Sequence, residues 1–418
     1  MAGSTRRVML YTHNSIGLGH VFRSLAVITG MRAWAPDWDF LVMSGSSIPQ
    51  TFLAEGIEVL KLPGVRRDFV DGKATLRPRH LGTLTIKQAL DLRARLMAEA
   101  LAGFAPDIVL VEHNMAGLGG ELLPLLEQKR RRRGGARDFA LAHLSRGILS
   151  AYPEADGRGE GLGHAMTPND ITGLYDFRYI LEDRGVVATG PEAGRPALDG
   201  RAVCLGKIAI RNRDELPPAS QAKRAWGLPD QALILFSLGR VGPVARLTRV
   251  LGQIMLASGL LPGHRLAVVV DPYLPPDERQ ELERCAESLG ANLLGFSPRL
   301  VELINAADLL VCRAGYNTFN EALLTGTRTL FVPEGHGGME QERRVARLAG
   351  PHQASASEAE VLAGGIEDQI QRLLKSPRDP APPLLDRFAV GRRMVRDLEG
   401  WLRGHRAVAP GEGSSCRA

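Results

Sequence analysis

A histidine follows a glycine-rich turn near the start of the chain, in the segment THNSIGLGHVFRSLAVI from Thr12 to Ile28. The apolar residues before Gly17 predict a strand, and the amphipathic residues after Gly19 predict a helix that starts near His20. A helix N-terminus lowers the pKa of a nearby imidazole, and a neutral imidazole is an effective general base. We therefore predict that His20 is catalytic. The alternative is that His20 only caps its own helix.

A carboxylate ends a second apolar stretch, PDIVLVEHN, whose last residues are Glu112, His113 and Asn114. The carboxyl ends of neighbouring parallel strands lie at the same edge of a sheet, so Glu112 can lie beside the end of the first strand. We expect Glu112 to hold the far ring nitrogen of His20, as an orienting group holds a general base. The alternatives are that Glu112 caps the following turn or pairs with an arginine.

A third set of polar residues follows the apolar stretch DLLVC in the second half of the chain. This stretch ends in Arg313, Ala314 and Gly315, and a helix is expected to start near Asn317 and Thr318. Backbone N–H groups at a helix start that follows small residues can bind a diphosphate. Glu321, one turn into the helix, can accept two hydrogen bonds from a ribose diol.

The next apolar stretch, TLFVP, leads into the glycine-rich loop EGHGGMEQE. This loop delivers Glu340 and Gln341, and an acid beside an amide suits the hydroxyl groups of a sugar ring. The residues in this half of the chain thus suit a diphosphate, a ribose and the hydroxyl groups of a sugar.

Several classes of ligand are disfavoured because their motifs are incomplete. The dinucleotide fingerprint needs a third glycine where Phe22 stands, and an acid after a second strand, DFLVMSGSS, that ends without one. The first half contains no GxxxxGK[ST] motif. No cluster of acids and histidines has the look of a metal site, so we expect neither a metal ion nor another cofactor.

Composition limits the partners and the compartment of the chain. Aromatic residues make up only 5% of the 418 residues, which argues against a stacking platform for nucleic acid. Four widely spaced cysteines fit reduced thiols. No run approaches the ~18 apolar residues of a membrane span, and the N-terminus lacks a signal-peptide pattern. We expect a cytoplasmic protein with no transmembrane segment and at most a peripheral membrane contact.

Apolar strands alternate with helical patterns in both halves of the chain, which predicts parallel sheets covered on both faces. The expected α/β fold is two doubly wound, Rossmann-like domains that face each other across a cleft. We expect an N-terminal domain over residues 1–212 and a C-terminal domain over residues 213–380. The family resemblance given below implies that the first is acceptor-binding and the second nucleotide-sugar-binding. Residues 381–405 are expected to form a helix that packs back on the first domain, and residues 406–418 to form a disordered tail.

The segment CRAGYNTFNEALLTGTRTLFVP resembles the donor-binding signature of GT-B glycosyltransferases. It is most similar to the MurG-like branch, the peptidoglycan N-acetylglucosaminyltransferases with a family 28 C-terminal domain. The turn GLGH before the first helix and the turn ILFSLGR also resemble that family. The acid at Glu340 departs from the usual Gln or Asp, which leaves the identity of the sugar open.

The resemblance implies a glycosyltransferase that moves a sugar, with inversion, from a nucleotide-sugar to an acceptor hydroxyl, with UDP as the favoured nucleotide. His20 would take the acceptor proton or lie next to the donor phosphates, with Glu112 behind it. The residues expected to contact the donor are Gly19, Gly239, Arg240, Phe296, Arg313, Gly315, Asn317, Thr318, Glu321, Glu340 and Gln341. The acceptor would be a small or lipid-linked molecule of secondary metabolism or the cell envelope.

Basic residues in the loop GVRRDFVDGKATLRPRHLG favour an anionic acceptor, although a solvated charged loop is the alternative. These residues are Arg66, Arg67, Lys73, Arg77 and Arg79. A second long segment, SRGILSAYPEADGRGEGLGHAMTPNDITG, is also expected to serve the acceptor. Two other functions stay open: a UDP-N-acetylglucosamine 2-epimerase-like enzyme, and a non-catalytic nucleotide-sugar binding protein.

Overall fold

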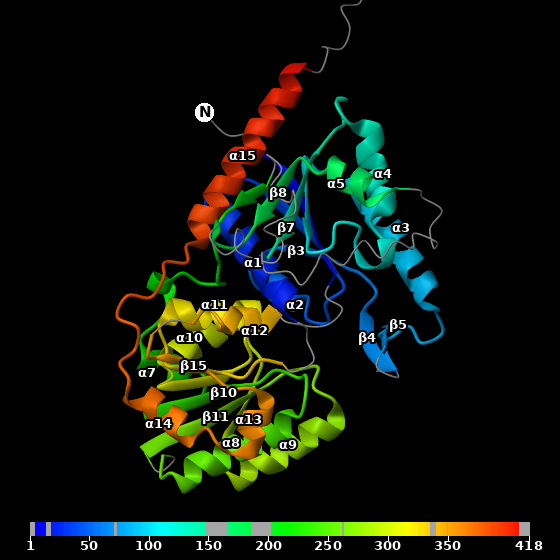
Figure 1. Ribbon diagram of the computed structural model, residues 1–418. Helices are drawn as coiled ribbons and strands as arrows, with labels where there is room; N and C mark the ends of the chain where they lie inside the picture. The colour runs from blue at the N-terminus through cyan, green and yellow to red at the C-terminus, as the bar shows by residue number, and fades with distance from the viewer. Residues whose placement is uncertain are drawn as a thin grey trace, which may run out of the picture. The chain divides into compact units, whose positions relative to one another are not determined.

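The computed structural model describes residues 5–13, 18–70, 73–146, 166–184, 202–260, 263–334, 340–348 and 350–408 (Figure 1). The chain forms two compact units. Unit 1 comprises Met1–Gly147, Ala151–Gly206 and Arg387–Ala418, and unit 2 comprises Ile148–Ser150 and Lys207–Asp386. The predicted α/β class, with parallel sheets in two domains, is confirmed.

Unit 1 is built on a seven-stranded parallel sheet with the strand order β3-β2-β1-β6-β7-β8-β9. Its strands are β1 (Arg7–Thr12), β2 (Asp39–Ser44), β3 (Glu58–Lys61), β6 (Ile108–Glu112), β7 (Ala140–Ser145), β8 (Phe177–Ile180) and β9 (Ala202–Cys204). Every residue of β6 and β7 is buried, because helices cover both faces of the sheet. The order reverses between β1 and β6, which pair in parallel.

Two groups of helices cover this sheet (Figure 1). α3 (Ile86–Phe104) and α4 (Leu123–Arg132) pack over one face, where Met97, Leu101 and Leu126 join the core. α1 (Gly19–Arg32) and α15 (Arg387–Val408) lie side by side. The smaller elements are α2 (Gln50–Leu53), the hairpin β4 (Val65–Val70) and β5 (Lys73–Pro78), the 3-10 turn η1 (Leu118–Gly120) and α5 (Pro168–Leu174).

The last helix, α15, returns the chain to unit 1. It lies very close to α1, since a Cβ atom added to Gly391 would lie 2.1 Å from the backbone of Gly30. Its Trp401 ring lies 4.8 Å from the ammonium group of Lys129. Lys129 itself is fully buried and pairs with Asp138 and Asp176.

The predicted domain boundaries can be compared with this division. The chain passes from unit 1 to unit 2 after Gly206 and returns after Asp386, whereas the sequence predicted boundaries after residues 212 and 380. The part of the predicted tail beyond residue 408 lies outside the described residues.

Unit 2 is built on a six-stranded parallel sheet with the order β12-β11-β10-β13-β14-β15. Its strands are β10 (Ala232–Ser237), β11 (His264–Val270), β12 (Asn292–Gly295), β13 (Leu309–Cys312), β14 (Thr329–Phe331) and β15 (Gln353–Ser355). Here the order reverses between β10 and β13, which also pair in parallel. In sheets of this kind ligands bind beyond the carboxyl ends of the strands at the reversal point.

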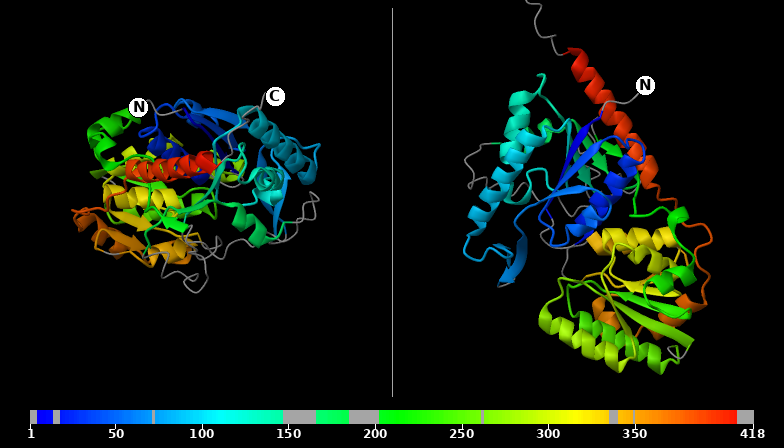
Figure 2. Two further views of the ribbon diagram at one scale, coloured as in Figure 1. Left: turned by 90° about the horizontal axis from the view of Figure 1, so that it is seen from above. Right: turned by 180° about the vertical axis from the view of Figure 1, so that it is seen from behind.

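Helices cover both faces of this second sheet (Figure 2). One face carries α8 (Val244–Ala257), α9 (Pro276–Ser288), α13 (Glu358–Ala363) and α14 (Glu367–Lys375), and the other carries α10 (Leu300–Ala306) and α11 (Tyr316–Thr325). The remaining elements are η2 (Arg213–Glu215), α7 (Ala219–Ala225) and α12 (Glu340–Val345). No helix among the described residues is long and apolar enough to cross a membrane.

Candidate active site

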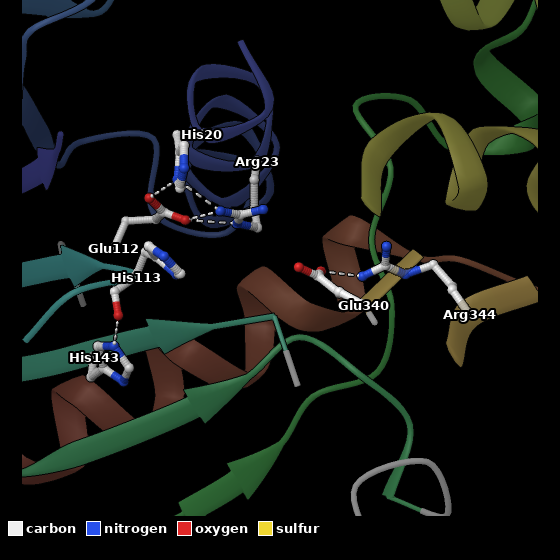
Figure 3. A network of polar contacts seen from close by, with 7 residues as sticks. All are labelled: His20, Arg23, Glu112, His113, His143, Glu340 and Arg344. Carbon is white, nitrogen blue, oxygen red and sulfur yellow. Dashed lines mark hydrogen bonds and ion pairs between the residues drawn. The ribbon is translucent and has the colours of Figure 1, made fainter. Parts of the chain in front are cut away.

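The structure brings together the two residues that the sequence singled out in unit 1. His20 is the second residue of α1, and Glu112 is the last residue of β6. The imidazole Nδ1 of His20 lies 2.6 Å from Oε2 of Glu112 (Figure 3). Because β1 and β6 are neighbours, α1 starts where the strand order reverses, and this pair lies at the expected ligand-binding edge of the sheet.

Arg23, one turn further along α1, contacts the same carboxylate (Figure 3). Its Nε donates to Oε1 of Glu112 at 2.8 Å, and a terminal nitrogen donates to the same oxygen. Burial alone would raise the pKa of Glu112, but the charges of Arg23 and His20 outweigh burial and hold that pKa well below its usual range. Glu112 is therefore an ionised carboxylate inside the protein.

The ionised carboxylate fixes the tautomer of His20. A carboxylate only accepts hydrogen bonds, so Nδ1 of His20 carries the proton that it donates to Glu112. The 3.0 Å approach of Arg23 to the same Nδ1 is then a contact between two N–H groups. In the neutral ring the lone pair lies on Nε2. This nitrogen is the atom that can accept a proton from a substrate.

His20 is neutral near pH 7 because its pKa is lowered. Burial is the largest cause; Glu112 opposes it, while the charges of Arg23 and Arg146 add to it. The sequence predicted a lowered pKa from the helix N-terminus, whereas burial and two arginines account for it here. A partly buried, neutral, carboxylate-oriented imidazole is the arrangement that general-base catalysis needs.

Two further histidines contact His20, and sequence reasoning gave neither a primary role. The ring of His13, which follows β1, lies 4.3 Å from the His20 ring in an edge-on arrangement. The ring of His113, which follows β6, lies 5.2 Å from it. Both could have been noticed because each is the first residue beyond a strand that ends at the reversal point. Burial is the main cause that holds the pKa of both rings well below the usual value.

The structure contains one group of side chains that sequence reasoning did not expect. His13, His20 and Glu112 each bring one potential ligand atom within 4.8 Å of the others. The expectation that no such cluster exists was wrong, because His13 was overlooked. The group is nevertheless a poor cation site, since the positive charge of Arg23 is hydrogen-bonded to the same carboxylate.

In unit 2, Arg313 follows β13 at the reversal point, but its role differs from the prediction. Its five N–H groups serve the carbonyl oxygens of Leu238, Val241, Val332 and Pro333 and the carboxylate of Glu358. Arg313 was expected to contact the donor, and its N–H groups are instead occupied by partners within the chain. The residue is buried and fixes the loops around the site.

The helix start after Arg313 is arranged much as the sequence predicted. α11 begins at Tyr316, and Asn317 and Thr318 lie in its first turn. A Cβ atom added to Gly315, the residue before α11, would meet no atom within 4 Å, so this edge has open space beside the backbone. Such a helix start can receive an anion.

Glu321 lies in the second turn of α11 and is 7% exposed. Burial raises its pKa to about 7. Its carboxylate has no hydrogen-bond or ion-pair partner in the part of the chain that the structure describes. A buried carboxylate without a partner is unfavourable for folding, and such groups mark functional sites more often than structural ones.

Gln341 and Glu340 lie at the start of α12, which is tied to the loop before α11. The side-chain oxygen of Gln341 accepts from the amides of Ala314 at 3.1 Å and Glu334 at 3.3 Å. Arg344 donates to the carbonyl of Ala314 at 2.7 Å and to Glu340 at 2.5 Å (Figure 3). The glycine-rich part of this loop, residues 335–339, lies outside the described residues.

The remaining predicted donor residues lie at the ends of neighbouring strands of unit 2. Gly239, after β10, has a φ of +67°, a conformation that favours glycine. The guanidinium of the next residue, Arg240, lies 5.6 Å from the ring of Tyr273, which follows β11. Phe296 follows β12. In unit 1, Gly19 is the first residue of α1, whereas Gly17 lies outside the described residues.

Two Rossmann-like units with polar side chains at each reversal point define a two-domain, GT-B-like α/β enzyme. Residues 269–384 match the family described as Glycosyltransferase family 28 C-terminal domain. The matched residues lie within unit 2, and the match confirms the resemblance and the prediction of a glycosyltransferase.

One relative is the UDP-N-acetylglucosamine–N-acetylmuramyl-(pentapeptide) pyrophosphoryl-undecaprenol N-acetylglucosamine transferase of Bordetella petrii. The chain is 27% identical to it over 344 residues, which are 81% of this chain and 80% of that protein.

Solved structures of two kinds share the fold. The UDP-N-acetylglucosamine 2-epimerase of Neisseria meningitidis, bound to UDP-N-acetylglucosamine, is 14% identical with a TM-score of 0.60, and covers 94% of this chain and 100% of that chain. The calicheamicin glycosyltransferase CalG4 is 15% identical with a TM-score of 0.52, and covers 97% of both chains. At these identities the similarity concerns the fold alone, and the fold is shared by transferases and epimerases.

Proposed function

We propose that this protein transfers a sugar from a UDP-sugar to an acceptor hydroxyl, with His20 as the general base. The observation that carries the proposal is the 2.6 Å contact between His20 and the ionised Glu112. It leaves Nε2 of a neutral imidazole as the proton acceptor. UDP is favoured because the Bordetella petrii relative is a transferase that uses a UDP-sugar.

The proposed reaction is a single displacement with inversion. The acceptor oxygen attacks the anomeric carbon, its proton passes to Nε2 of His20, and the bond from the anomeric carbon to the diphosphate oxygen breaks. Glu112 holds the ring and stabilises the imidazolium ion that forms. The backbone at the start of α11, beside Gly315, Asn317 and Thr318, would stabilise the departing diphosphate without a metal ion.

The donor contacts in this proposal come from unit 2. Glu321 would accept hydrogen bonds from the ribose, which would satisfy its unpartnered carboxylate. The amide nitrogen of Gln341 has no partner within the described residues, so it can donate to a sugar hydroxyl, with Glu340 beside it. Arg240 and the turn at Gly239 would face the nucleotide.

The proposed acceptor is an anionic molecule that is either small or lipid-linked. In the hairpin of unit 1, Arg66 of β4 lies directly opposite Arg77 of β5, and both are exposed. Opposed residues share one face of a hairpin, so the two guanidinium groups place positive charge on a surface that an anionic acceptor could approach. The Bordetella petrii relative acts on a lipid-linked pyrophosphoryl acceptor, which fits such a role and a peripheral membrane contact. Most of the second predicted acceptor segment lies outside the described residues.

The second candidate function is epimerisation of a UDP-sugar, which the shared fold with 2-epimerases favours. An epimerase would need further carboxylates that can act as acid and base beside the sugar. In unit 1, Glu112 is already engaged by Arg23 and His20, so it is badly placed to exchange protons with a substrate. A non-catalytic binding protein would have no use for an imidazole oriented by an ionised carboxylate.

The experiment that tests the proposal incubates the protein with UDP-N-acetylglucosamine, with and without candidate anionic acceptors. Acceptor-dependent release of UDP that is lost in His20→Ala would support transfer. Formation of the C2 epimer without an acceptor would replace the proposal by epimerisation. Binding without either product would favour the non-catalytic alternative. A thermal-shift screen of UDP-, dTDP- and GDP-sugars would choose the donor first, because a ligand that binds only the folded state raises its stability.

A further inference from the structure

His113, directly beside Glu112, has an unusual backbone conformation. Its φ is +73°, and the only other described non-glycine residue with a positive φ is Ala105. This region is unfavourable for residues with a Cβ atom, so neighbouring groups must hold His113 there. Its amide donates to the carbonyl of Leu144 at 2.9 Å. Its carbonyl accepts a hydrogen bond from Nε2 of His143 at 2.8 Å (Figure 3).

The hydrogen bond to His113 is the only one that the His143 side chain makes among the described residues. It lies in the middle of β7, is 1% exposed, and its pKa is lowered to about 4, chiefly by burial. The ring is therefore neutral, and because a carbonyl only accepts, Nε2 carries its proton. The other nitrogen, Nδ1, is buried with no partner among the described residues. The His143 ring also packs edge-on against the ring of Tyr175. An apolar ring could do the same and would avoid the unsatisfied atom, so the hydrogen bond to His113 is what favours an imidazole here.

His143 contacts the backbone of His113, and the ring of His113 lies beside the base. Its centroid lies 5.2 Å from that of His20, with an angle of 52° between the rings. His13 lies on another side of His20, 4.3 Å away and nearly perpendicular. The charged or titratable groups that act on His20 are thus Glu112, Arg23, Arg146, His13 and His113. Glu112 holds one nitrogen, and the neighbouring rings limit rotation of the imidazole.

We propose that His143 is a positioning residue for the base: by holding the carbonyl of His113, it keeps the His113 ring against His20 and the His20 Nε2 in one direction. His113 is then part of the site through its ring, and His143 acts only through His113. The effect on turnover rests on the proposed function, whereas the placement of the His20 ring can be observed without any reaction.

The test compares His143→Leu, which removes the donor, with His143→Gln, whose side-chain nitrogen can replace Nε2. The readout is the ¹⁵N spectrum of protein labelled at histidine, with the His20 signals assigned from their loss in His20→Ala. The native protein is expected to show one His20 tautomer, protonated at Nδ1. His143→Leu is expected to show averaged or broadened His20 signals, and His143→Gln to restore the native pattern.

A matched control comes from the neighbouring strand. Tyr179 in β8 is fully buried and its hydroxyl also has no partner within the described part of the chain. Tyr179→Phe should leave the His20 signals unchanged. This result would show that removing a buried polar atom from this sheet does not by itself disturb the His20 ring. Native His20 signals in folded His143→Leu would overturn the proposal.

A second variant keeps the proposal testable if His143→Leu does not fold. His113→Gly accepts the positive φ without strain and removes the ring, so it should fold and release the His20 ring. Unchanged His20 signals in this variant would equally overturn the proposal. If the native protein transfers sugar, His143→Leu should lower kcat on the order of 10²-fold with an unchanged donor KM, the size expected for a misplaced catalytic group. If no transfer is found, the proposed function fails and the spectra still decide the role of His143.

Discussion

Replacing Glu112 by glutamine should separate the catalytic use of the buried charge from its structural use. Glu112→Gln keeps the size and shape of the side chain but removes the charge that faces His20 and Arg23. The amide can then present an N–H to the imidazole, so Nδ1 is no longer kept protonated. General-base catalysis contributes roughly 10²–10⁴-fold, and we expect kcat to fall within that range.

The same change should destabilise unit 1 for a different reason. The guanidinium of Arg23 is buried, and Glu112→Gln removes the carboxylate with which it forms an ion pair. Removing one partner of a buried ion pair typically costs about 3–5 kcal/mol. The double variant Arg23→Met/Glu112→Gln removes both charges, so its free energy of unfolding should return toward the native value. Its kcat should remain low, because the base is still not oriented.

Glu121 offers a matched control in the same unit. This carboxylate is also buried, and it pairs with Arg93 and accepts a hydrogen bond from Tyr11. Glu121→Gln should cost a similar amount of unfolding free energy, measured in urea, while the folded fraction keeps its kcat for UDP release. A native kcat in Glu112→Gln, or an equal loss of kcat in Glu121→Gln, would refute the reasoning.

Three further predictions concern the donor, the metal and the last helix. Because the pKa of Glu321 is raised to about 7, the folded state disfavours its ionisation, so its contribution to stability should fall as the pH rises from about 4.5 to about 7. Urea unfolding of Glu321→Gln should lack this fall, and its donor KM should rise by an amount equivalent to roughly 1–3 kcal/mol. UDP release should persist in EDTA, and its loss with recovery on adding Mg²⁺ would show that a metal is needed. Gly391→Ala should lower stability by about 1–3 kcal/mol because its Cβ would overlap the backbone of Gly30. In Gly400→Ala, in the same helix, the added Cβ would meet no atom within 4 Å, so stability should rise by about 0.5–1 kcal/mol. Thermal unfolding of both variants measures these changes.

The sequence alone predicted the fold and the central pair of the site because both depend on local patterns. Apolar stretches that alternate with helices predicted two parallel sheets, and parallel sheets bring strand ends to one edge. His20 and Glu112 each stand at such an end, so their contact could be expected although 92 positions separate them. Glu321 could be expected because the resemblance covers its own helix.

The partners of these residues could not be predicted, because they are fixed by packing between distant segments. Arg23 looks like an ordinary polar residue of an amphipathic helix, and only the position of Glu112 makes it part of a buried ion pair. Arg313 looks like a free cation beside a diphosphate site, yet four carbonyl groups from two loops and one carboxylate enclose it. The bond from His143 to the backbone of His113 depends on a positive φ that no sequence pattern signals.

The contrast between Arg313 and Glu321 shows how the structure distinguishes a scaffold charge from a ligand-facing one. Arg313 directly follows β13 at the reversal point of unit 2, and Glu321 lies in the second turn of the helix α11 that comes next. Both residues are largely buried. Arg313 has a partner for every donor, so its burial is compensated within the folded chain and a ligand would have to displace a native bond. Glu321 has none in the described structure, and burial raises its pKa to about 7. Hydroxyl groups of a ligand could supply the missing hydrogen bonds, so Glu321 is better placed than Arg313 to gain from binding.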